Sequence, residues 1–263
     1  MKIGFIGCGN MASGMIRGIL ASGRAKKADL SASDRSEEAK KRIRDEFGIA
    51  CASNEEIAAG SDLLVLAVKP QVYEAVIPQI RSLVKDTTIL VSIAPGKSLS
   101  WLREQFGREL KIVRVMPNTP ALVQEGMSAL SPNALVSEEE LDLVLSLFRS
   151  FGKALTVPEN MLDVVTAVSG SSPAYVFLFI EAMADGAVAL GMPRAQAYEF
   201  AAQAVLGSAK MVLETGLHPG QLKDMVCSPG GTTIEAVRVL EEKGFRSGVM
   251  EAVLACARKA RGM

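Results

Sequence analysis

The sequence predicts an α/β fold in two parts: an N-terminal domain over residues 1–157 built on a mostly parallel sheet, and an all-α domain over residues 158–263. Short β-branched runs alternate with amphipathic stretches through the first part, as strands joined by crossover helices require. The run Leu63–Val68 is apolar without interruption, which is typical of a strand buried on both faces. After Pro158 the patterns are helical and no strand pattern is found, so the boundary is expected there.

The first predicted strand leads into a glycine-rich turn. An apolar run ends in Gly7-Cys8-Gly9-Asn10-Met11-Ala12, which opens a helix that ends at Gly23. In a Gly-x-Gly-x-x-Ala pattern the first glycine allows a tight turn, the second lets a pyrophosphate approach the backbone, and the small third residue keeps the helix close to the strand. Free N–H groups at the helix N-terminus suit phosphate. The turn therefore predicts a Rossmann-like, dinucleotide-binding domain, and a purely structural glycine turn is the alternative.

The other elements of the N-terminal domain follow at regular intervals. The predicted strands are short apolar or β-branched runs, and the predicted helices carry apolar residues at helical spacing. Strands are predicted at Leu30–Ser33, Leu63–Val68, Ile89–Ile93, Ile112–Met116 and Ala154–Val157, and helices at Glu37–Phe47 and Glu138–Phe151. Gly48 is placed to end the first of these two helices.

Composition argues against several classes of function. Lys+Arg and Asp+Glu both total 29, so no net positive field attracts nucleic acid or an anionic membrane. The four cysteines are far apart and the chain has one histidine, so we expect reduced, mostly buried thiols rather than a zinc site or a disulfide framework. The chain runs directly into a strand without a signal-peptide pattern. We therefore expect a cytoplasmic protein that binds no nucleic acid and no metal.

The C-terminal part contains a long apolar stretch. Val164–Ile180 is interrupted by Gly170 and Pro173 and bounded by acidic residues, so it does not match a membrane span. The overlapping segment Ala174–Gly191 is nearly apolar all round, and such a helix needs neighbours on all sides. We predict a dimerisation domain that forms a homodimer through its helices, with a ring of dimers as a larger assembly. An ordinary buried core helix is the alternative.

Polar loops are placed where ligands would bind. Asn54 and Lys69 lie in loops of the first half, and ligands of open α/β sheets bind beyond the carboxyl ends of the strands. Lys69 directly follows a buried strand, so we expect it near a nicotinamide or a ribose, with a solvated lysine as the alternative. In the second half, Ser169–Pro173 and Ser228–Thr233 each precede a helical pattern. Helix N-termini rich in N–H and hydroxyl donors suit a small carboxylate, and plain N-capping is the alternative.

A strong acid is missing from these loops. Reduction of a carbonyl usually needs a positioned acid to protonate the developing alkoxide. Neither helical loop contains a lysine, and His218 lies in Gly216–Gly220, a sequence typical of an exposed turn, so it is not expected to be catalytic. A protonated C=N bond is already cationic and needs no such acid. The shortage of acids therefore favours reduction of C=N over C=O.

At these same residues, and across nearly its whole length, the chain resembles pyrroline-5-carboxylate reductases. The shared motifs are the glycine-rich turn, Ala67–Pro70, Asn118–Pro120, Ser169–Ser171, Pro173–Tyr175, His218–Asp224 and Ser228–Ile234. The stretch from Gln221 to Thr233 is far more specific than any glycine turn. The resemblance implies an NADPH-dependent oxidoreductase that reduces the C=N bond of the small-molecule substrate Δ1-pyrroline-5-carboxylate to give L-proline, the last step of proline biosynthesis.

The resemblance also implies roles for single residues. The expected cofactor contacts are Gly7, Gly9, Asn10, Met11, Ser33, Asn54, Ala67, Lys69 and Pro70. The expected substrate contacts are Ser171, Gly230, Gly231, Thr232 and Thr233. Thr233 is the expected catalytic residue, hydrogen-bonded to the ring nitrogen of the substrate.

Two positions depart from simple expectation. Ser172 stands where the family often has glycine before the proline, which leaves the backbone path of that loop open. After the second strand, Asp34 would bind the ribose 2′-OH of NAD and repel a 2′-phosphate, whereas Arg35 and Ser33 could receive that phosphate. The two signals conflict, and the resemblance favours NADPH, with NADH also accepted.

Two other functions stay open at this point. A dehydrogenase of hydroxy or keto acids would commonly carry a lysine in the active-site motif of its helical domain, and Ser169–Tyr175 contains none. A non-catalytic nucleotide-binding module would leave the loop Ser228–Thr233 unexplained.

Overall fold

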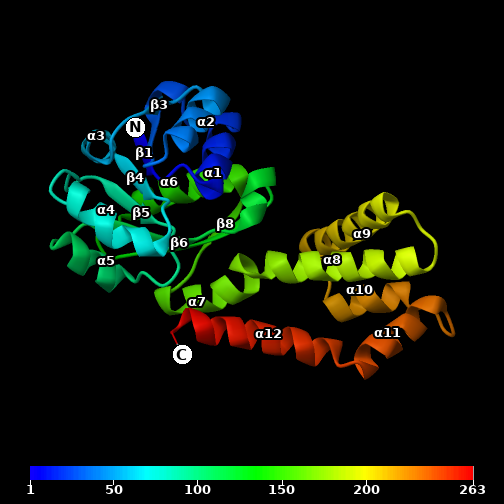
Figure 1. Cartoon of the computed structure of the whole chain (residues 1–263). Coiled ribbons are helices and arrows are strands. Elements are labelled where there is room, and N and C mark those ends of the chain that lie inside the picture. The colour runs from blue at the N-terminus through cyan, green and yellow to red at the C-terminus, as the bar shows by residue number, and fades with distance from the viewer. Residues whose placement is uncertain (263) are drawn as a thin grey trace. The chain divides into compact units, whose positions relative to one another are not determined.

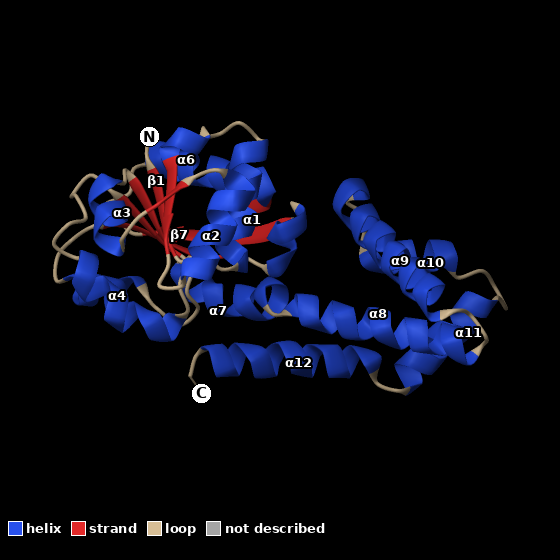
Figure 2. Cartoon of the chain, turned by 45° about the horizontal axis from the view of Figure 1, so that its top comes forward, coloured by secondary structure: helices blue, strands red, loops and turns tan. Residues whose placement is uncertain are grey.

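The computed structural model describes residues 1–262, and these form two compact units. The first unit comprises residues 1–171 together with the chain from Cys256 onward, and the second comprises residues 172–255. All strands belong to the first unit (Figure 2). The last strand ends at Thr156, while the compact units divide after Ser171, so the expected boundary at 157/158 stays a prediction.

The first unit is built on one eight-stranded sheet in the order β3-β2-β1-β4-β5-β6-β7-β8 (Figure 1). Every neighbouring pair is parallel except β6 and β7, which are antiparallel. The strands are β1 (Ile3–Ile6), β2 (Leu30–Ser33), β3 (Ala50–Cys51), β4 (Leu63–Leu66), β5 (Ile89–Ser92), β6 (Lys111–Met116), β7 (Gly126–Pro132) and β8 (Gly152–Thr156). The sheet confirms the predicted Rossmann-like, mostly parallel architecture.

Helices cover both faces of this sheet. α1 (Asn10–Ala21), α2 (Glu37–Phe47) and α6 (Glu138–Phe148) share a core with one face, whereas α3 (Asn54–Gly60), α4 (Tyr73–Ile80) and α5 (Leu99–Phe106) share a core with the other. Successive strand residues alternate between the two cores: Leu63 and Val65 join the first, and Leu64 and Leu66 join the second. This two-sided burial explains why β4 is an uninterrupted apolar run.

Local sequence signals define where these helices begin and end. The Ser36 side chain accepts the Ala39 N–H at the start of α2, and Gly48 ends that helix in a left-handed conformation, as predicted. Ser137 and Glu140 form a reciprocal capping box at the start of α6. The predicted helix Glu138–Phe151 ends as α6 at Phe148 and continues as a 3-10 turn, Arg149–Phe151.

Two strands were not predicted from the sequence. β3 has only two residues, which is too short for a periodic pattern. β7 reads GMSALSP, and its glycine, serines and proline conceal a strand in which Ser128 and Ser131 are nevertheless buried. The other predicted strands are present, with ends that differ by one or two residues.

Beyond β8, residues 157–262 form helices and connecting loops and contain no strand. A 3-10 turn, Glu159–Met161, leads into α7 (Leu162–Val165) and a π-helical turn, Thr166–Gly170, all within the first unit. The helices that follow are α8 (Ser172–Ala189), α9 (Arg194–Thr215), α10 (Pro219–Val226), α11 (Thr232–Glu242) and α12 (Phe245–Ala260). α8 packs against α9, and among residues 172–255 only Ala184, Ala197, Ala201 and Leu222 are buried hydrophobic residues. The second unit therefore has almost no core of its own.

One helical run, Glu159–Ala189, is long and apolar enough to cross a membrane by length and composition alone, with a mean hydropathy of 1.4 over its most apolar window. Only 6% of that window is buried. The run is interrupted by the π-helical turn and carries Glu181 and Asp185.

A close approach between β7 and β8 provides a test of the fold. Gly152 has a φ of +146°, and a Cβ atom there would lie 1.9 Å from the Gly126 carbonyl oxygen. We expect Gly152→Ala to lower the free energy of unfolding by about 3 kcal/mol, because both the strained φ and the clash must be relieved. Gly23→Ala is the control, since Gly23 also has a positive φ but no atom within 4 Å of its Cβ position, and it should cost only about 1–2 kcal/mol. Urea unfolding followed by the fluorescence of Trp101, the one tryptophan, measures both. Equal effects of the two variants would contradict the clash.

Candidate functional site

The glycine-rich turn joins β1 to α1. Gly7 has a φ of +111°, and a Cβ atom there would lie 2.6 Å from the carbonyl oxygen of Ala67, which follows β4. Gly9 is the N-cap of α1, no side chain caps the helix, and its first turn contains no acidic residue. No atom lies within 4 Å of the position that a Cβ of Gly9 would take. The N–H groups at the start of α1 are therefore open to an anion.

A cavity of about 430 Å³ lies next to this turn in the first unit. Its wall comes from the segments that follow β1, β4, β5 and β6 and from the π-helical turn at Thr166–Gly170. The lining residues are Gly9, Asn10, Met11, Ala67, Val68, Lys69, Pro70, Ile93, Ala94, Pro95, Met116, Pro117, Asn118, Thr119, Thr166, Gly170 and Ser171. The cavity thus lies at the carboxyl ends of the parallel strands, where ligands of such sheets bind. It brings together seven of the residues predicted to contact cofactor or substrate.

These features fit a dinucleotide. The uncapped start of α1 and the empty space at Gly9 suit a pyrophosphate. Lys69, which is exposed, adds a positive charge at the cavity, and its side-chain ammonium makes no hydrogen bond or ion pair within residues 1–262. A purely structural glycine turn would require neither feature.

Two further predicted cofactor residues lie together away from this cavity. The buried Ser33 hydroxyl donates to the Asn54 side-chain oxygen over 2.7 Å, and the Asn54 amide donates to Gln79 over 2.7 Å. Arg35 is exposed just after β2 and makes no hydrogen bond or ion pair in the described chain. The structure therefore joins Ser33 to Asn54 and leaves the Arg35 guanidinium free.

The serine-rich turn closes one side of the cavity. The Ser171 N–H donates to the Thr166 carbonyl over 2.8 Å, which fixes the end of the π-helical turn. Ser172 is the first residue of α8, and the only non-glycine residue with a positive φ among residues 1–262 is Gln124. The side chain of Ser172 is therefore accommodated at the start of an ordinary helix, without backbone strain.

Asn118 is a site residue to which sequence reasoning assigned no role. It lines the cavity and is only 9% exposed. Its side-chain oxygen accepts the Met127 N–H over 2.8 Å, and its amide donates to the Ser169 carbonyl over 3.1 Å. One side chain thus ties the end of β6 to the start of β7 and to the serine-rich turn. The sequence offered one signal for this role, namely that Asn118 is a polar residue shortly after the end of a buried strand.

The remaining predicted substrate residues lie in the second unit. Gly230 has a φ of +68°, the Gly231 N–H donates to the Ser228 carbonyl over 3.1 Å, and Gly231 is the N-cap of α11. No side chain caps this helix, whose first residues are Thr232 and Thr233. The start of α11 therefore offers free N–H groups, as the start of α1 does. These residues are not among those that line the cavity, whereas Ser171 is.

Ionisable groups are scarce in the cavity. Lys69 is the one ionisable side chain among the residues that line the cavity. His218 is exposed and is the N-cap of α10, where its Nδ1 accepts the Gly220 N–H over 3.0 Å; the last two residues of the predicted turn Gly216–Gly220 are the first two residues of that helix. The cysteines are free, but only Cys8 is fully buried and the other three are half-buried. Within residues 1–262 no group of three or more His, Cys, Asp or Glu side chains could hold a metal ion.

Two family models match the chain. The model described as pyrroline-5-carboxylate reductase dimerisation matches residues 159–263, and that described as NADP oxidoreductase, coenzyme F420-dependent, matches residues 2–96. The pyrroline-5-carboxylate reductase of Escherichia coli K12 is 55% identical over 260 residues, which cover 98% of this chain and 97% of the relative.

Solved structures agree along the whole chain. A Plasmodium falciparum pyrroline carboxylate reductase with NADP bound has a TM-score of 0.90 and 36% identity, covering 100% of this chain and 97% of that one. A pyrroline-5-carboxylate reductase from Coxiella burnetii has a TM-score of 0.92 and 34% identity, covering 99% and 97% of the two chains.

The bridge made by Asn118 can be tested against a matched residue. Asn118→Ala leaves the Met127 N–H and the Ser169 carbonyl without partners, and the serine-rich turn should shift. Because a displacement of about 1 Å at a site can cost about 100-fold, we expect dinucleotide-dependent turnover to fall by about 10- to 100-fold.

Asn133→Ala is the control. Asn133 bridges Ile112 and Leu110 at the other end of β6 and does not line the cavity. Both variants should unfold at similarly reduced urea concentrations, but only Asn118→Ala should lose turnover. If both variants lose turnover in proportion to their loss of stability, Asn118 has no specific role at the site.

Proposed function

The chain belongs to the pyrroline-5-carboxylate reductase family, and we propose that it reduces Δ1-pyrroline-5-carboxylate to L-proline with NADPH, the last step of proline biosynthesis. It is an NAD(P)H-dependent oxidoreductase that acts on a C=N bond. Six of the residues predicted to contact the cofactor line the cavity: Gly9, Asn10, Met11, Ala67, Lys69 and Pro70.

One observation carries the choice of an imine over a carbonyl. Lys69 is the one ionisable side chain on the cavity wall. An alkoxide that develops from a carbonyl would need a proton donor within hydrogen-bond reach. A protonated cyclic imine already carries the positive charge that makes its carbon accept electrons. Lys69 is assigned to the cofactor here, and the other lining residues offer only amides, hydroxyls and apolar groups. Such a site suits C=N reduction, because it has only to bind and orient the reactants.

The first unit supplies the cofactor site in this proposal. NADPH, when bound, supplies a hydride to the C=N carbon. Gly7 and Gly9 let the backbone approach the pyrophosphate, and Asn10 and Met11 start the helix that faces it. Beyond them, Ala67, Lys69 and Pro70 line the cavity, while Ser33, Arg35 and Asn54 lie at the carboxyl end of β2, where the adenosine ribose binds in Rossmann domains.

Substrate recognition would draw on Ser171 and on the start of α11. The backbone N–H groups of Gly230, Gly231 and Thr232 suit the substrate carboxylate, because the helix has no side-chain cap and its dipole favours an anion. Thr233 would orient the ring nitrogen. Its side chain is half-buried, and its hydroxyl makes no hydrogen bond within residues 1–262. These features support a ligand-binding role over plain capping.

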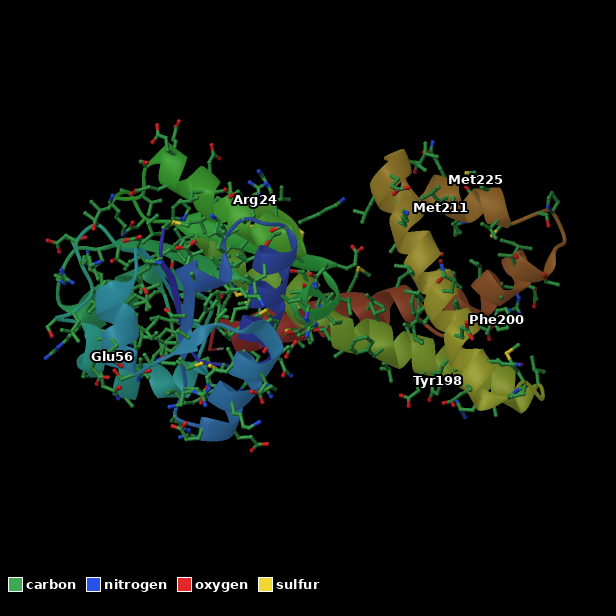
Figure 3. The ribbon with its side chains drawn as sticks, turned by 90° about the horizontal axis from the view of Figure 1, so that it is seen from above. Arg24, Glu56, Tyr198, Phe200, Met211 and Met225 are labelled. Atoms are coloured by element: carbon green, nitrogen blue, oxygen red, sulfur yellow. The ribbon has the colours of Figure 1, made fainter. Side chains whose placement is uncertain are left out.

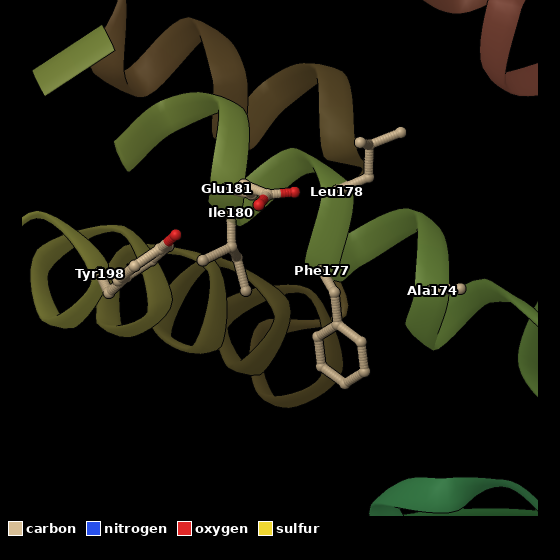
Figure 4. A pocket seen from close by; sticks show the side chains of 6 residues that line it. All are labelled: Ala174, Phe177, Leu178, Ile180, Glu181 and Tyr198. Atoms are coloured by element: carbon tan, nitrogen blue, oxygen red, sulfur yellow. The ribbon is translucent and has the colours of Figure 1, made fainter. Parts of the chain in front are cut away.

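We propose that the second unit completes its core by forming a homodimer through the C-terminal helices. Eight large apolar side chains there are 60% or more exposed, namely Phe177, Leu178, Leu190, Phe200, Leu213, Met225, Val226 and Met250 (Figure 3 labels two of them, Phe200 and Met225). A groove of about 570 Å³ lies between α8 and α9, lined by Phe177, Ile180 and Tyr198 among others (Figure 4). An isolated chain rarely leaves so much apolar surface in water. A ring of such dimers is the larger assembly to look for.

The same argument bears on location. A second copy would cover the apolar run Glu159–Ala189 in place of lipid. Together with the zero net charge of the chain, this supports a cytoplasmic protein that does not bind membranes or nucleic acid.

The reaction is tested by following NADPH and NADH oxidation with Δ1-pyrroline-5-carboxylate, its six-membered analogue and a panel of keto acids. We expect turnover on the five-membered imine and none on the keto acids. The activation free energy for the six-membered ring, taken from kcat/KM, should differ from that for the five-membered ring by about 1–3 kcal/mol at most. One extra methylene contributes no more than this in an apolar pocket. Turnover on a keto acid alone would establish a dehydrogenase of that class, and nucleotide binding without any turnover would establish a binding module.

The role of Thr233 is tested with a pair of variants. Thr233→Val removes the hydroxyl at constant shape, and we expect kcat/KM for the imine to fall by about 10- to 100-fold, the value of one hydrogen bond to a charged group. The dissociation constant of NADPH should not change. Thr233→Ser should restore most of the activity. Unchanged steady-state rates in Thr233→Val would eliminate this role.

Lys69→Ala serves as the contrast, because Lys69 lines the cavity of the first unit. It should raise the KM for NADPH while the KM for the imine stays near its original value.

The dimer is tested by size-exclusion chromatography with light scattering. We expect the native chain to elute as a dimer or a multiple of it, and Leu178→Asp to be monomeric, because a buried charge at an interface is strongly unfavourable. Leu155→Asp is the control, since Leu155 is similarly exposed but lies on β8 of the first unit. A monomeric native chain would overturn the proposal.

A further inference from the structure

Asp34 follows β2 at the position where an acidic residue commonly binds the ribose 2′-OH of NAD. Its carboxylate is engaged elsewhere. One oxygen accepts the Cys8 N–H over 2.8 Å, and the other accepts the Ser36 N–H over 2.9 Å. Both oxygens therefore hold main chain, one in the glycine-rich turn and one in the segment that starts α2.

Cys8, the middle residue of the glycine-rich turn, is held from both sides. Its carbonyl accepts a hydrogen bond from the Arg42 guanidinium over 2.7 Å, while Asp34 holds its N–H. The Gly7 N–H donates to the Ser33 carbonyl over 2.8 Å, which adds a third link to the end of β2. The Cys8 thiol is buried, and burial, reinforced by the Asp34 carboxylate, raises its pKa to about 12. The thiol stays neutral, and Asp34 and Arg42 instead hold the main chain of Cys8.

We propose that Asp34 is a positioning residue that clamps the glycine-rich turn in its pyrophosphate-binding conformation, and that it does not select between NADPH and NADH. This inference rests on the proposed use of a nicotinamide dinucleotide. Discrimination then falls to Arg35, whose exposed guanidinium is free to receive a 2′-phosphate.

The charges around Asp34 support this assignment. The negatively charged Asp34 binds the N–H of Cys8, and the positively charged Arg42 binds its carbonyl. Lys40 lies near the thiol of the same residue. A carboxylate that already accepts two charge-assisted hydrogen bonds gains little from a ribose hydroxyl. If Asp34 is removed, the buried N–H of Cys8 loses its acceptor, and the turn that every dinucleotide must contact is loosened. The loss should therefore be shared by both cofactors.

The experiment measures dissociation constants of NADP⁺ and NAD⁺ by titration calorimetry on the full chain. We expect Asp34→Ala to raise both dissociation constants by about tenfold, which is the value of a hydrogen bond to a charged group. The ratio of the two constants should not change. Asp34→Asn keeps one acceptor oxygen and should show a smaller loss, again equal for the two. Arg35→Ala should weaken NADP⁺ alone, by about tenfold.

Asp29→Ala is the matched control. Asp29 is an acidic residue beside the opposite end of β2, paired with Lys2 at 3.0 Å, and its loss should change neither constant. Hydrogen exchange of the peptide spanning residues 6–12 gives a direct second readout: Asp34→Ala and Asp34→Asn should speed exchange at Cys8, and Asp29→Ala should not.

Two outcomes would overturn the inference. If Asp34→Ala weakens NAD⁺ while NADP⁺ binds as well or better, Asp34 reads the ribose. If neither dissociation constant nor the exchange at Cys8 changes in Asp34→Ala, the clamp has no role. These experiments measure only cofactor binding and hydrogen exchange. A negative result would therefore not contradict the proposed imine reductase activity, and a protein without that activity could still show the expected role of Asp34.

Discussion

The parallel pairing of β1 with β4 is the constraint on which the site depends. Its register sets Ile6 beside Leu66, so the chain leaves both strands at the same edge of the sheet and Gly7 meets the carbonyl of Ala67. Only a residue without a Cβ fits there. The start of α1, the segment after β4 and the cavity they line all follow from this one approach.

The two units differ sharply in how they are stabilised. The first buries apolar residues on both faces of its sheet, so it has two cores of its own. In the second, the buried residues of α8 and α9 are alanines, and many large apolar side chains are exposed to solvent. In the proposed homodimer, association would bury these side chains and make the stability of the second unit depend on protein concentration. Dimer formation and folding of the second unit are therefore expected to be coupled.

The site is held by polar side chains that touch main chain rather than by acids and bases facing the cavity. Asn118 ties the serine-rich turn to β6 and β7, and Asp34 ties the glycine-rich turn to β2. Below them, the buried Arg114 pairs with Glu159 at 3.1 Å, and Glu159 also accepts the Leu99 N–H. Such an arrangement fixes geometry, which is the main demand of a reaction between a bound hydride donor and an electrophile that is already charged.

Local patterns were enough to predict the Rossmann-like domain, the helical second half, the family and seven of the residues that line the cavity, because periodicity and short motifs are properties of neighbouring residues. Tertiary structure decided what local patterns do not encode. β7 pairs antiparallel although its composition conceals a strand, and Asn118 gains its role only where three distant segments meet. Asp34 illustrates the physical reason most clearly: the sequence placed an acid beside the cofactor site, but which groups its carboxylate accepts depended on where the main chain of Cys8 and Ser36 came to lie.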